Sequence, residues 1–305
     1  MDKFITILGP TASGKTKLAV ALANEIGGEI ISADSRQVYR DMNIGTGKDL
    51  AEYTFEGKKI PYHLIDILDA GEKYNVFQFQ KDFKLVSEEI QAKGKKVILC
   101  GGTGQYISSV LQDFKYTEVP ANESFRNELE LKTDFELLTI FNNYKTDFNE
   151  IAKTESRKRL IRAIEINTYL AQNVHFDTKA YKRESILFGL DLSVELRRER
   201  ITKRLNDRLE SGLIEEVEGL LKDGVDPETL TYYGLEYKFI VDYLFDRYDF
   251  DTFVTLLEIA IHQFAKRQMT YFRKIEKDGY KIHWIDGTQN INQQLQNIIS
   301  ILNPN

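Results

Sequence analysis

An α/β fold built on a parallel β-sheet is the fold class that the sequence predicts, and three observations predict it. Over the first hundred residues, short apolar runs of strand length alternate with stretches of helical periodicity. A glycine-rich turn joins the first of these runs to the first helical stretch. The strand signal then disappears after about residue 120 and returns near residue 186. Because strands that alternate with helices form parallel sheets with helices on both faces, we expect such a core, interrupted by a mostly helical insertion.

Each element follows from a local pattern. Apolar runs predict strands over 4–8, 29–33, 97–100, 186–190 and 281–285. The apolar spacing after the glycine-rich turn predicts a helix through Ile26, which Gly27 and Gly28 stop. Asn75 is placed to cap a second helix, because its side chain can accept a hydrogen bond from the first turn. In the insertion, residues 159–170 have helical character, and long helices make up most of the remaining chain.

The domain organisation follows from the change in composition. Residues 121–183 hold almost no strand signal and are rich in Glu, Lys, Asn and Arg, whereas an apolar strand resumes at Ile186. We therefore predict a core domain made of residues 1–119 and 186–305, and a helical insertion domain over residues 120–185.

Composition and charge exclude several classes of protein. The chain has 305 residues, of which 42 % are hydrophobic and 29 % charged, as is usual for a globular protein. No apolar run approaches the roughly 20 residues that a membrane-spanning helix needs. A lone cysteine, Cys100, excludes an internal disulfide and a cysteine-based zinc site. We expect a cytoplasmic monomer without membrane contact, and the net charge of −6 means that any basic surface for nucleic acid must be local.

The glycine-rich turn has the residues of a phosphate-binding loop. The segment GPTASGKT fits the pattern G-x-x-x-x-G-K-[ST] without a gap. In such a loop, backbone N–H groups converge on phosphate oxygens, the lysine adds a positive charge, and the hydroxyl of Thr16 can bind Mg²⁺. The sequence therefore predicts a P-loop NTPase-like core that binds a diphosphate or a triphosphate. The predicted binding residues are Gly9, Pro10, Thr11, Ala12, Ser13, Gly14, Lys15 and Thr16.

The acidic residue of this core does not lie where ATPases usually carry it. The most apolar strand, 97–100, is followed by glycines instead of an acid, which argues against an ordinary ATPase. Asp34 instead follows the strand predicted over 29–33. Because the strand ends of an open α/β sheet face the ligand crevice, we expect Asp34 to lie close to the phosphate loop.

Six blocks of sequence together resemble one family. In chain order they are GPTASGKT, ISADSRQVYRDMNIGTGKD, PYHLIDILDAGEKYNVFQFQKDF, GGTGQY, RLIRAIEI and QFAKRQMTYFRK. Their order and spacing are similar to those of tRNA dimethylallyltransferases, enzymes that prenylate the adenosine beside the anticodon. The resemblance runs from Gly9 to about Arg273, so it covers most of the chain.

The resemblance implies a specific reaction. In that family the phosphate loop, although of a kind common in nucleotide-binding and ATP-binding proteins, holds the diphosphate of dimethylallyl diphosphate, and ATP is not consumed. The dimethylallyl group passes to N6 of the adenosine 3′ to the anticodon, position 37, in tRNAs that read codons starting with U. By this resemblance Asp34 is the general base, Thr103 lies near the diphosphate and the target base, and Lys15 with Mg²⁺ at Thr16 neutralises the leaving group.

The resemblance also implies contacts to the anticodon stem-loop of tRNA. The implied residues are Asp34, Ser35, Arg36, Gln37, Thr103, Arg126, Arg159, Arg162, Tyr233, Gly234, Lys266, Arg267 and Arg273. Three of them belong to the predicted insertion, which would then contact tRNA. The chain departs from the residues common in the family at Gly47, Gln105, Leu235 and Glu236.

Two questions stay open on the sequence. Arg197, Arg200, Arg204 and Arg208 recur at about one-turn intervals, which is typical of a solvated helix flank or of a diphosphate clamp in which Arg200 or Arg204 points inward. Arg204 is included among the predicted diphosphate-binding residues. The acceptor is the second question, because enzymes that prenylate free AMP or ADP share this phosphate loop. A small-molecule kinase and a non-catalytic tRNA-binding module are further alternatives. The insertion favours tRNA, since a free nucleotide needs no such platform.

Overall fold

The computed structural model describes residues 3–112, 115–178 and 182–303. They form two compact units, a core unit of residues 1–111 and 183–305 and an insertion unit of residues 112–182. The sequence-based boundaries of 120 and 185 differ from this division. Tyr116 and Val119 pack into the apolar cluster of the insertion, and the backbone N–H of Arg183 donates a hydrogen bond to Leu111 of the core, so both junctions move toward the N-terminus.

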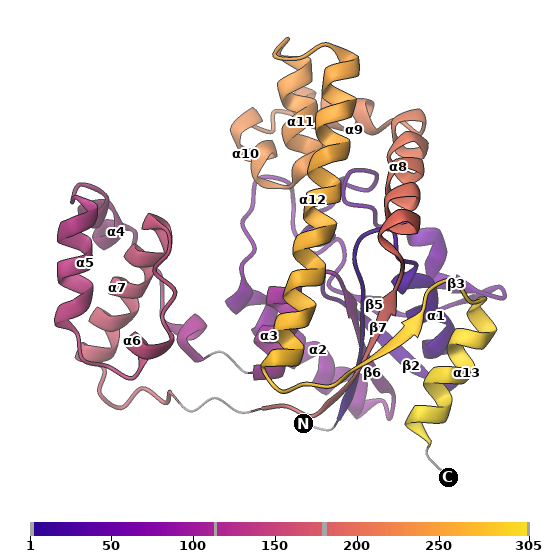
Figure 1. The fold of residues 1–305 in the computed structure, drawn as a ribbon, viewed down its shortest axis with the longest axis horizontal. Coiled ribbons are helices and arrows are strands. Elements are labelled where there is room, and N and C mark those ends of the chain that lie inside the picture. Colours follow the sequence, from indigo (N-terminus) through magenta and orange to yellow (C-terminus); the bar gives the residue numbers. More distant parts are fainter. Residues whose placement is uncertain (1–2, 113–114, 179–181, 304–305) are drawn as a thin grey trace. The chain divides into compact units, whose positions relative to one another are not determined.

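The core unit contains a parallel sheet of six strands (Figure 1). Its order is β5 (Tyr62–His63), β2 (Gly28–Ser32), β6 (Lys96–Gly101), β1 (Phe4–Leu8), β7 (Ser185–Asp191) and β8 (Ile282–Asp286). Every strand pair in this sheet is parallel. The predicted strands and the α/β fold class are thereby confirmed. The sequence did not reveal β5 or the hairpin of β3 (Thr54–Phe55) and β4 (Lys58–Lys59), because two-residue strands carry no periodicity.

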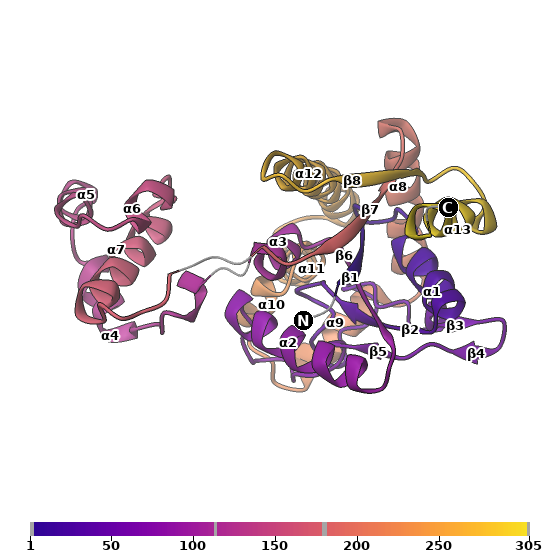
Figure 2. The ribbon, with the colours of Figure 1, turned by 90° about the horizontal axis from the view of Figure 1, so that it is seen from below.

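Both faces of the sheet are apolar, as a parallel sheet requires. In β1, Ile5 and Ile7 pack with helices α1 (Lys15–Ile26) and α13 (Ile291–Leu302), whereas Phe4 and Leu8 point to the opposite face. That opposite face carries α2 (Val76–Ala92) and α3 (Gly104–Gln112), and Figure 2 shows the two groups of helices on either side of the sheet. The predicted cap of α2 is confirmed, since the Asn75 side chain accepts a hydrogen bond from the N–H of Gln78.

A layer of helices follows β7 and reaches the carboxyl ends of the strands. It consists of α8 (Val194–Glu210), α9 (Leu213–Lys222), α10 (Pro227–Tyr232), α11 (Leu235–Leu244) and α12 (Phe250–Lys277). The longest of these, α12, extends beside the rest of the layer down to α3 (Figure 1). Among the described residues, none of the helices combines the length and the apolar character that a membrane span requires.

The insertion unit has its own core. It contains α4 (Glu123–Glu130), α5 (Asp134–Asn143), α6 (Phe148–Ile151) and α7 (Arg157–Gln172), together with a short 3₁₀ turn at Lys115–Glu118; a second such turn, Leu50–Tyr53, lies in the core unit. The helix expected over 159–170 is thus confirmed as part of α7. Leu160 and Ile164 of α7 pack with Leu137 and Phe141 of α5 in an apolar cluster made of described residues of this unit.

A buried carboxylate organises the insertion unit. The Glu165 side chain is 3 % exposed, and it accepts hydrogen bonds from Nε and Nη2 of Arg126, at 3.0 and 2.9 Å, and from the N–H of Asn122. Arg162 also pairs with it and donates to the carbonyl of Val119 at 2.7 Å. Burial alone would raise the pKa of Glu165, but these hydrogen bonds outweigh burial and hold the pKa below its ordinary value of 4.5.

We expect the substitution Glu165→Gln to destabilise the insertion unit by about 2–3 kcal/mol, because it removes the charge that two half-buried guanidinium groups face. The only tryptophan, Trp284, belongs to the core unit. In chemical denaturation of the variant, the circular dichroism signal should therefore begin to fall at a lower denaturant concentration, because the insertion unit unfolds earlier. The transition followed by tryptophan fluorescence, which reports on the core unit, should keep its midpoint. Glu155→Gln, which removes an exposed partner of Arg159, is the control and should change neither signal.

The same carboxylate predicts a dependence on pH. A carboxyl group whose pKa is lower in the folded state stabilises that state above its unfolded pKa, and the stabilisation is lost as the pH falls through the folded value. The insertion unit should consequently lose stability below pH 4.5, and Glu165→Gln should lack that part of the acid sensitivity. Equal acid sensitivity in the two proteins would contradict the assignment.

Candidate active site

One cavity of about 950 Å³ opens at the carboxyl ends of the strands in the core unit. Its walls are the phosphate loop, the segments that follow β2 and β6, and residues of α8, α11 and α12. This placement follows from the topology, because parallel strands all end at the same edge of the sheet. The sequence-predicted residues Lys15, Asp34 and Thr103 are brought together in the lining of this cavity.

The phosphate loop connects β1 directly to α1. Gly14 has a φ of +89°, a left-handed conformation that favours glycine, and it caps the N-terminus of α1. At Gly9 a Cβ atom would lie 2.6 Å from Oγ of Ser13, so the tight loop requires glycine there as well. The loop thus directs the first N–H groups of α1 toward the cavity, where an anion is favoured.

Lys15 is the cation of this loop. Its Nζ donates a hydrogen bond to the carbonyl of Pro10 at 3.4 Å, so the ammonium group lies over the loop itself. Burial lowers the pKa of Lys15, while the negative charge of Asp34 acts in the opposite direction. A bound anion would restore the favourable environment that burial removes.

Asp34 and Thr103 lie on adjacent strand ends. Oδ1 of Asp34 accepts a hydrogen bond from the N–H of Arg36 at 2.9 Å, and no residue that the structure describes donates one to Oδ2. Oγ1 of Thr103 accepts from the N–H of Ser35 at 3.2 Å. These contacts exist because β2 and β6 pair in register, and Gly101 has no side chain to keep them apart.

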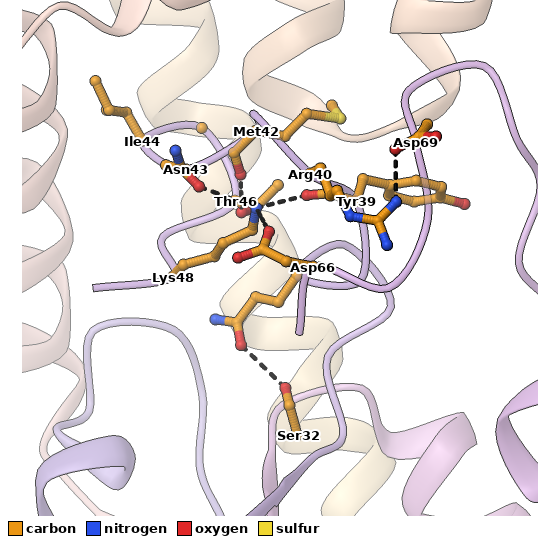
Figure 3. Close-up of polar contacts among 12 residues, drawn as sticks. Ser32, Tyr39, Arg40, Met42, Asn43, Ile44, Thr46, Lys48, Asp66 and Asp69 are labelled. Atoms are coloured by element: carbon orange, nitrogen blue, oxygen red, sulfur yellow. Dashed lines mark hydrogen bonds and ion pairs between the residues drawn. The ribbon is translucent and has the colours of Figure 1, made fainter. Parts of the chain in front are cut away.

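Gln37 is held by its own neighbours. Its Oε1 accepts a hydrogen bond from Oγ of Ser32 at 2.9 Å, the contact drawn to Ser32 in Figure 3, and its Nε2 donates to the carbonyl of Gly47 at 3.0 Å. The side-chain amide, predicted to contact tRNA, therefore already uses both ends within the chain. Arg36 lies on the cavity wall, with its guanidinium 5.1 Å from the ring centre of Tyr232.

The segment after Gln37 depends on a buried lysine that sequence reasoning missed. Nζ of Lys48 donates hydrogen bonds to the carbonyl of Tyr39 and to Oδ1 of Asn43, and it pairs with Asp66 (Figure 3). Its side chain is fully buried. A buried charge needs such a set of partners, and three of them hold the loop in one conformation. The lysine within GTGKD was the only signal for this site.

Three arginines of α8, Arg200, Arg204 and Arg208, line the cavity. Nη2 of Arg200 donates to the carbonyl of Gly287 at 3.2 Å, and Nη1 of Arg204 donates to Oγ1 of Thr11 at 3.3 Å. Arg204 also pairs with Asp49, while Arg208 lies deeper in the wall. Three arginines of the stripe consequently line the cavity instead of the outer helix surface, with Arg204 directed at the phosphate loop.

Two of the positions at which we expect a departure from the family, Gly47 and Glu236, meet at Arg208. Its guanidinium lies 3.6 Å from Glu236, and Gly47, with a φ of +64°, would carry a Cβ atom 1.7 Å from Nη2 of this arginine. Burial raises the pKa of Glu236, and the charge of Arg208 opposes that rise. Glycine at 47 and the acid at 236 therefore belong to one local arrangement around Arg208. Gln105, another such position, lines the cavity.

The residues of the core unit that are predicted to contact tRNA include exposed residues and a buried one. Lys266, Arg267 and Arg273 are exposed along α12, and Gly234 lines the cavity. Tyr233 also lines the cavity, but it is only 1 % exposed, and its hydroxyl accepts from the N–H of Gly71 and donates to the carbonyl of Glu72. Its contact with tRNA stays a prediction. Its neighbour, at position 232, carries the exposed ring instead.

The arginines of the insertion have partners within that unit. Arg126 and Arg162 are engaged by Glu165, as described above, and their side chains are about one third exposed. Arg159 is more exposed and pairs with Glu155. Since the first two hold the insertion together, their structural role is established independently of any contact with RNA.

Comparison with known proteins points to one family. The family model described as IPP transferase matches residues 37–275. The chain is 51 % identical over 301 residues, 99 % of this chain and 98 % of the relative, to "tRNA dimethylallyltransferase 1" of Parabacteroides distasonis. It is 54 % identical over 285 residues, 93 % of each chain, to the protein of the same name in Azobacteroides pseudotrichonymphae.

Comparison with solved structures finds proteins with similar names and the same fold. The full-length tRNA isopentenylpyrophosphate transferase of Bacillus halodurans superposes with a TM-score of 0.73 at 30 % identity, covering 99 % of this chain and 96 % of that one. A eukaryotic dimethylallyltransferase acting on tRNA has the same fold, with a TM-score of 0.74 at 24 % identity and coverage of 99 % and 79 %. The chain therefore belongs to the IPP transferase family.

Proposed function

We propose that this protein is a tRNA dimethylallyltransferase. It transfers the dimethylallyl group of dimethylallyl diphosphate to N6 of the adenosine at position 37, 3′ to the anticodon, in tRNAs that read codons starting with U. The observation that carries the proposal is the convergence of Lys15, Asp34 and Thr103 on one cavity in a member of this family. The names of its relatives support prenyl transfer to tRNA.

The diphosphate end of the cavity is built for an anion. The N–H groups at the start of α1, the ammonium group of Lys15 and the guanidinium of Arg204 all belong to this end. Positive groups placed where the diphosphate leaves stabilise the charge that develops on it. Arg204 pairs with Asp49 and donates to the hydroxyl of Thr11, so its guanidinium is held beside the phosphate loop.

Mg²⁺ fits the residues present. This cation takes oxygen ligands and is commonly held by one or two side chains together with substrate phosphates. Thr16 lines the cavity at the first turn of α1, and its hydroxyl with diphosphate oxygens would hold the ion. The described residues include no group of three His, Cys, Asp or Glu side chains for a cage made of protein alone. When bound, the ion would neutralise part of the negative charge on the leaving diphosphate.

Asp34 lies at the acceptor end of the cavity, where the adenosine would bind. In the reaction N6 forms a bond to the allylic carbon, the bond from that carbon to oxygen breaks, and its electron pair leaves with the diphosphate. The proton released from N6 passes to the carboxylate of Asp34, whose Oδ1 is fixed by the N–H of Arg36. Thr103, tied to Ser35, lies at the same strand ends and helps to place the base.

The acceptor must enter the cavity as an extruded base. Extruding a base costs a few kcal/mol, which contacts to the flanking RNA must supply. The ring of Tyr232 is 45 % exposed and lies beside Arg36 on the cavity wall, and Lys266 and Arg267 are exposed on α12. These groups can stack on bases and bind phosphates, although the net charge of the whole chain is −6.

One assay tests the function. Labelled dimethylallyl diphosphate is supplied with unmodified tRNA, with AMP, or with the same tRNA carrying guanosine at position 37. Label should appear only in the first tRNA, as a prenylated adenosine. Label on AMP alone would establish an adenylate prenyltransferase, and no prenyl product with either acceptor would contradict prenyl transfer altogether.

A further inference from the structure

Gln268 of α12 bridges two loops of the candidate active site. Its Oε1 accepts a hydrogen bond from the N–H of Thr11 in the phosphate loop at 2.9 Å. Its Nε2 donates to the carbonyl of Gly102, in the segment after β6, at 2.9 Å. The residue is only 7 % exposed, and one planar amide thus satisfies one backbone donor and one backbone acceptor from different loops.

The chain is shaped to admit this bridge. At Gly102 a Cβ atom would lie 2.3 Å from Nε2 of Gln268, so a side chain there would push the amide away. At Gly104 it would lie 2.5 Å from the ring of Tyr271, which is one turn further along α12. The two glycines that flank Thr103 therefore allow α12 to lie directly on this segment.

The bridge continues to the general base. Between the two glycines, Oγ1 of Thr103 accepts from the N–H of Ser35, and its own N–H donates to the carbonyl of Ala33. These two residues flank Asp34 in the chain. A connected path of hydrogen bonds consequently runs from the phosphate loop through Gln268 to the backbone on both sides of Asp34.

We propose that Gln268 is a positioning residue that sets the distance between the diphosphate end and the acceptor end of the cavity. The inference rests on the proposed function, in which the allylic carbon must lie between a bound diphosphate and an adenine amino group. Gln268 lines the cavity wall, and in this role it acts through the two loops and not on the reacting groups. It holds the two loops in register, while each loop binds its own substrate with its own residues.

A positioning role has a distinctive kinetic signature. If the loops lose their register, each substrate still binds, but the reacting atoms are misplaced, and a displacement of about 1 Å can cost about 100-fold in rate. The loss should therefore appear in kcat, with both KM values nearly unchanged. A residue that binds diphosphate directly would instead raise the KM for the donor.

The first test is Gln268→Met, which keeps the length of the side chain and removes both hydrogen bonds. We expect the single-turnover rate at saturating substrates to fall by about 100-fold, with both KM values within about threefold of the native values. Gln80→Met is the matched control, because it removes a hydrogen bond to the carbonyl of Ser109 between α2 and α3, outside the cavity. Its rate should remain native, and thermal denaturation checks that both variants are folded.

The second test is Gln268→Glu, which also serves if the methionine variant does not fold. The introduced carboxyl group can accept from Thr11, but in its ionised form it repels the carbonyl of Gly102. Once protonated, it can donate to that carbonyl. The rate of this variant relative to the native protein should thus rise as the pH falls, whereas the ratio for Gln268→Met should stay flat.

The outcomes of these experiments distinguish a failure of the positioning role of Gln268 from a failure of the proposed function. A rate for Gln268→Met within about threefold of native, or a loss confined to the donor KM, would overturn the positioning role while the native enzyme remained a prenyltransferase. A pH-independent ratio for Gln268→Glu would overturn it as well. If the native protein transferred no prenyl group, the proposed function would be contradicted, and the positioning role of Gln268 with it.

Discussion

Asp34→Asn should lower the rate of prenyl transfer by about 10²–10⁴-fold while leaving the affinity for tRNA unchanged. The amide can still accept the hydrogen bond from the N–H of Arg36, so the loop should keep its conformation. What disappears is the group that takes the proton from N6 as the new bond forms. Single-turnover kinetics and filter binding of unmodified tRNA measure the two quantities separately.

The control is Asp41→Asn, which removes an equal charge from an exposed position outside the cavity. Asp41 has a φ of +60°, a conformation that Asn tolerates well. This variant should react at the native rate. Native turnover by Asp34→Asn would remove Asp34 from the mechanism, and a parallel loss of tRNA binding would reassign it to recognition.

Lys15→Gln should weaken the binding of dimethylallyl diphosphate and lower the rate of transfer by about 10²–10³-fold. The side chain is half-buried and its ammonium group lies over the phosphate loop, where water screens its interaction with a diphosphate less than at an exposed position. Titration calorimetry with dimethylallyl diphosphate and Mg²⁺, without tRNA, measures the binding term. Lys84→Gln, at an exposed position of α2, is the control and should bind the donor normally.

Donor binding should also weaken at alkaline pH. Because burial lowers the pKa of Lys15, the side chain loses its charge below the ordinary lysine value of 10.5, and the affinity for diphosphate falls as the pH rises through that lowered pKa. The Gln variant should lack this part of the pH dependence. If ATP displaced dimethylallyl diphosphate from the native protein at equal concentration, the loop would belong to a nucleotide site instead.

Local patterns were sufficient for most elements of the core. The strand 4–8, the helix that follows the phosphate loop and the cap at Asn75 depend on residues within a few positions of one another, and all three are present in the structure. The proximity of Asp34 to the phosphate loop also followed, because parallel strands end at one edge. The short strand β5 did not follow, since its two residues are fixed by pairing with β2.

The sequence could not show which of two adjacent, chemically similar side chains is buried and which is exposed. Tyr232 and Tyr233 are adjacent, yet the second is buried against Tyr39, with ring centres 4.4 Å apart, while the first is exposed. Likewise, the arginine stripe of α8 shows helical spacing whether it faces solvent or a cavity. Periodicity identifies a face of an element, but the surface on which that face packs comes from another part of the chain.

The sequence by itself determined the order of strands and helices, the phosphate loop, and Asp34 at a strand end, because each of these depends on residues close together in the chain. Only the tertiary structure decided that Gln268 joins Thr11 to Gly102, that Lys48 is buried against Asp66, and that Arg204 turns inward. The physical reason is that such contacts join residues from distant segments. Their partners are set by how the sheet and helices pack, and no local pattern of residues carries that information.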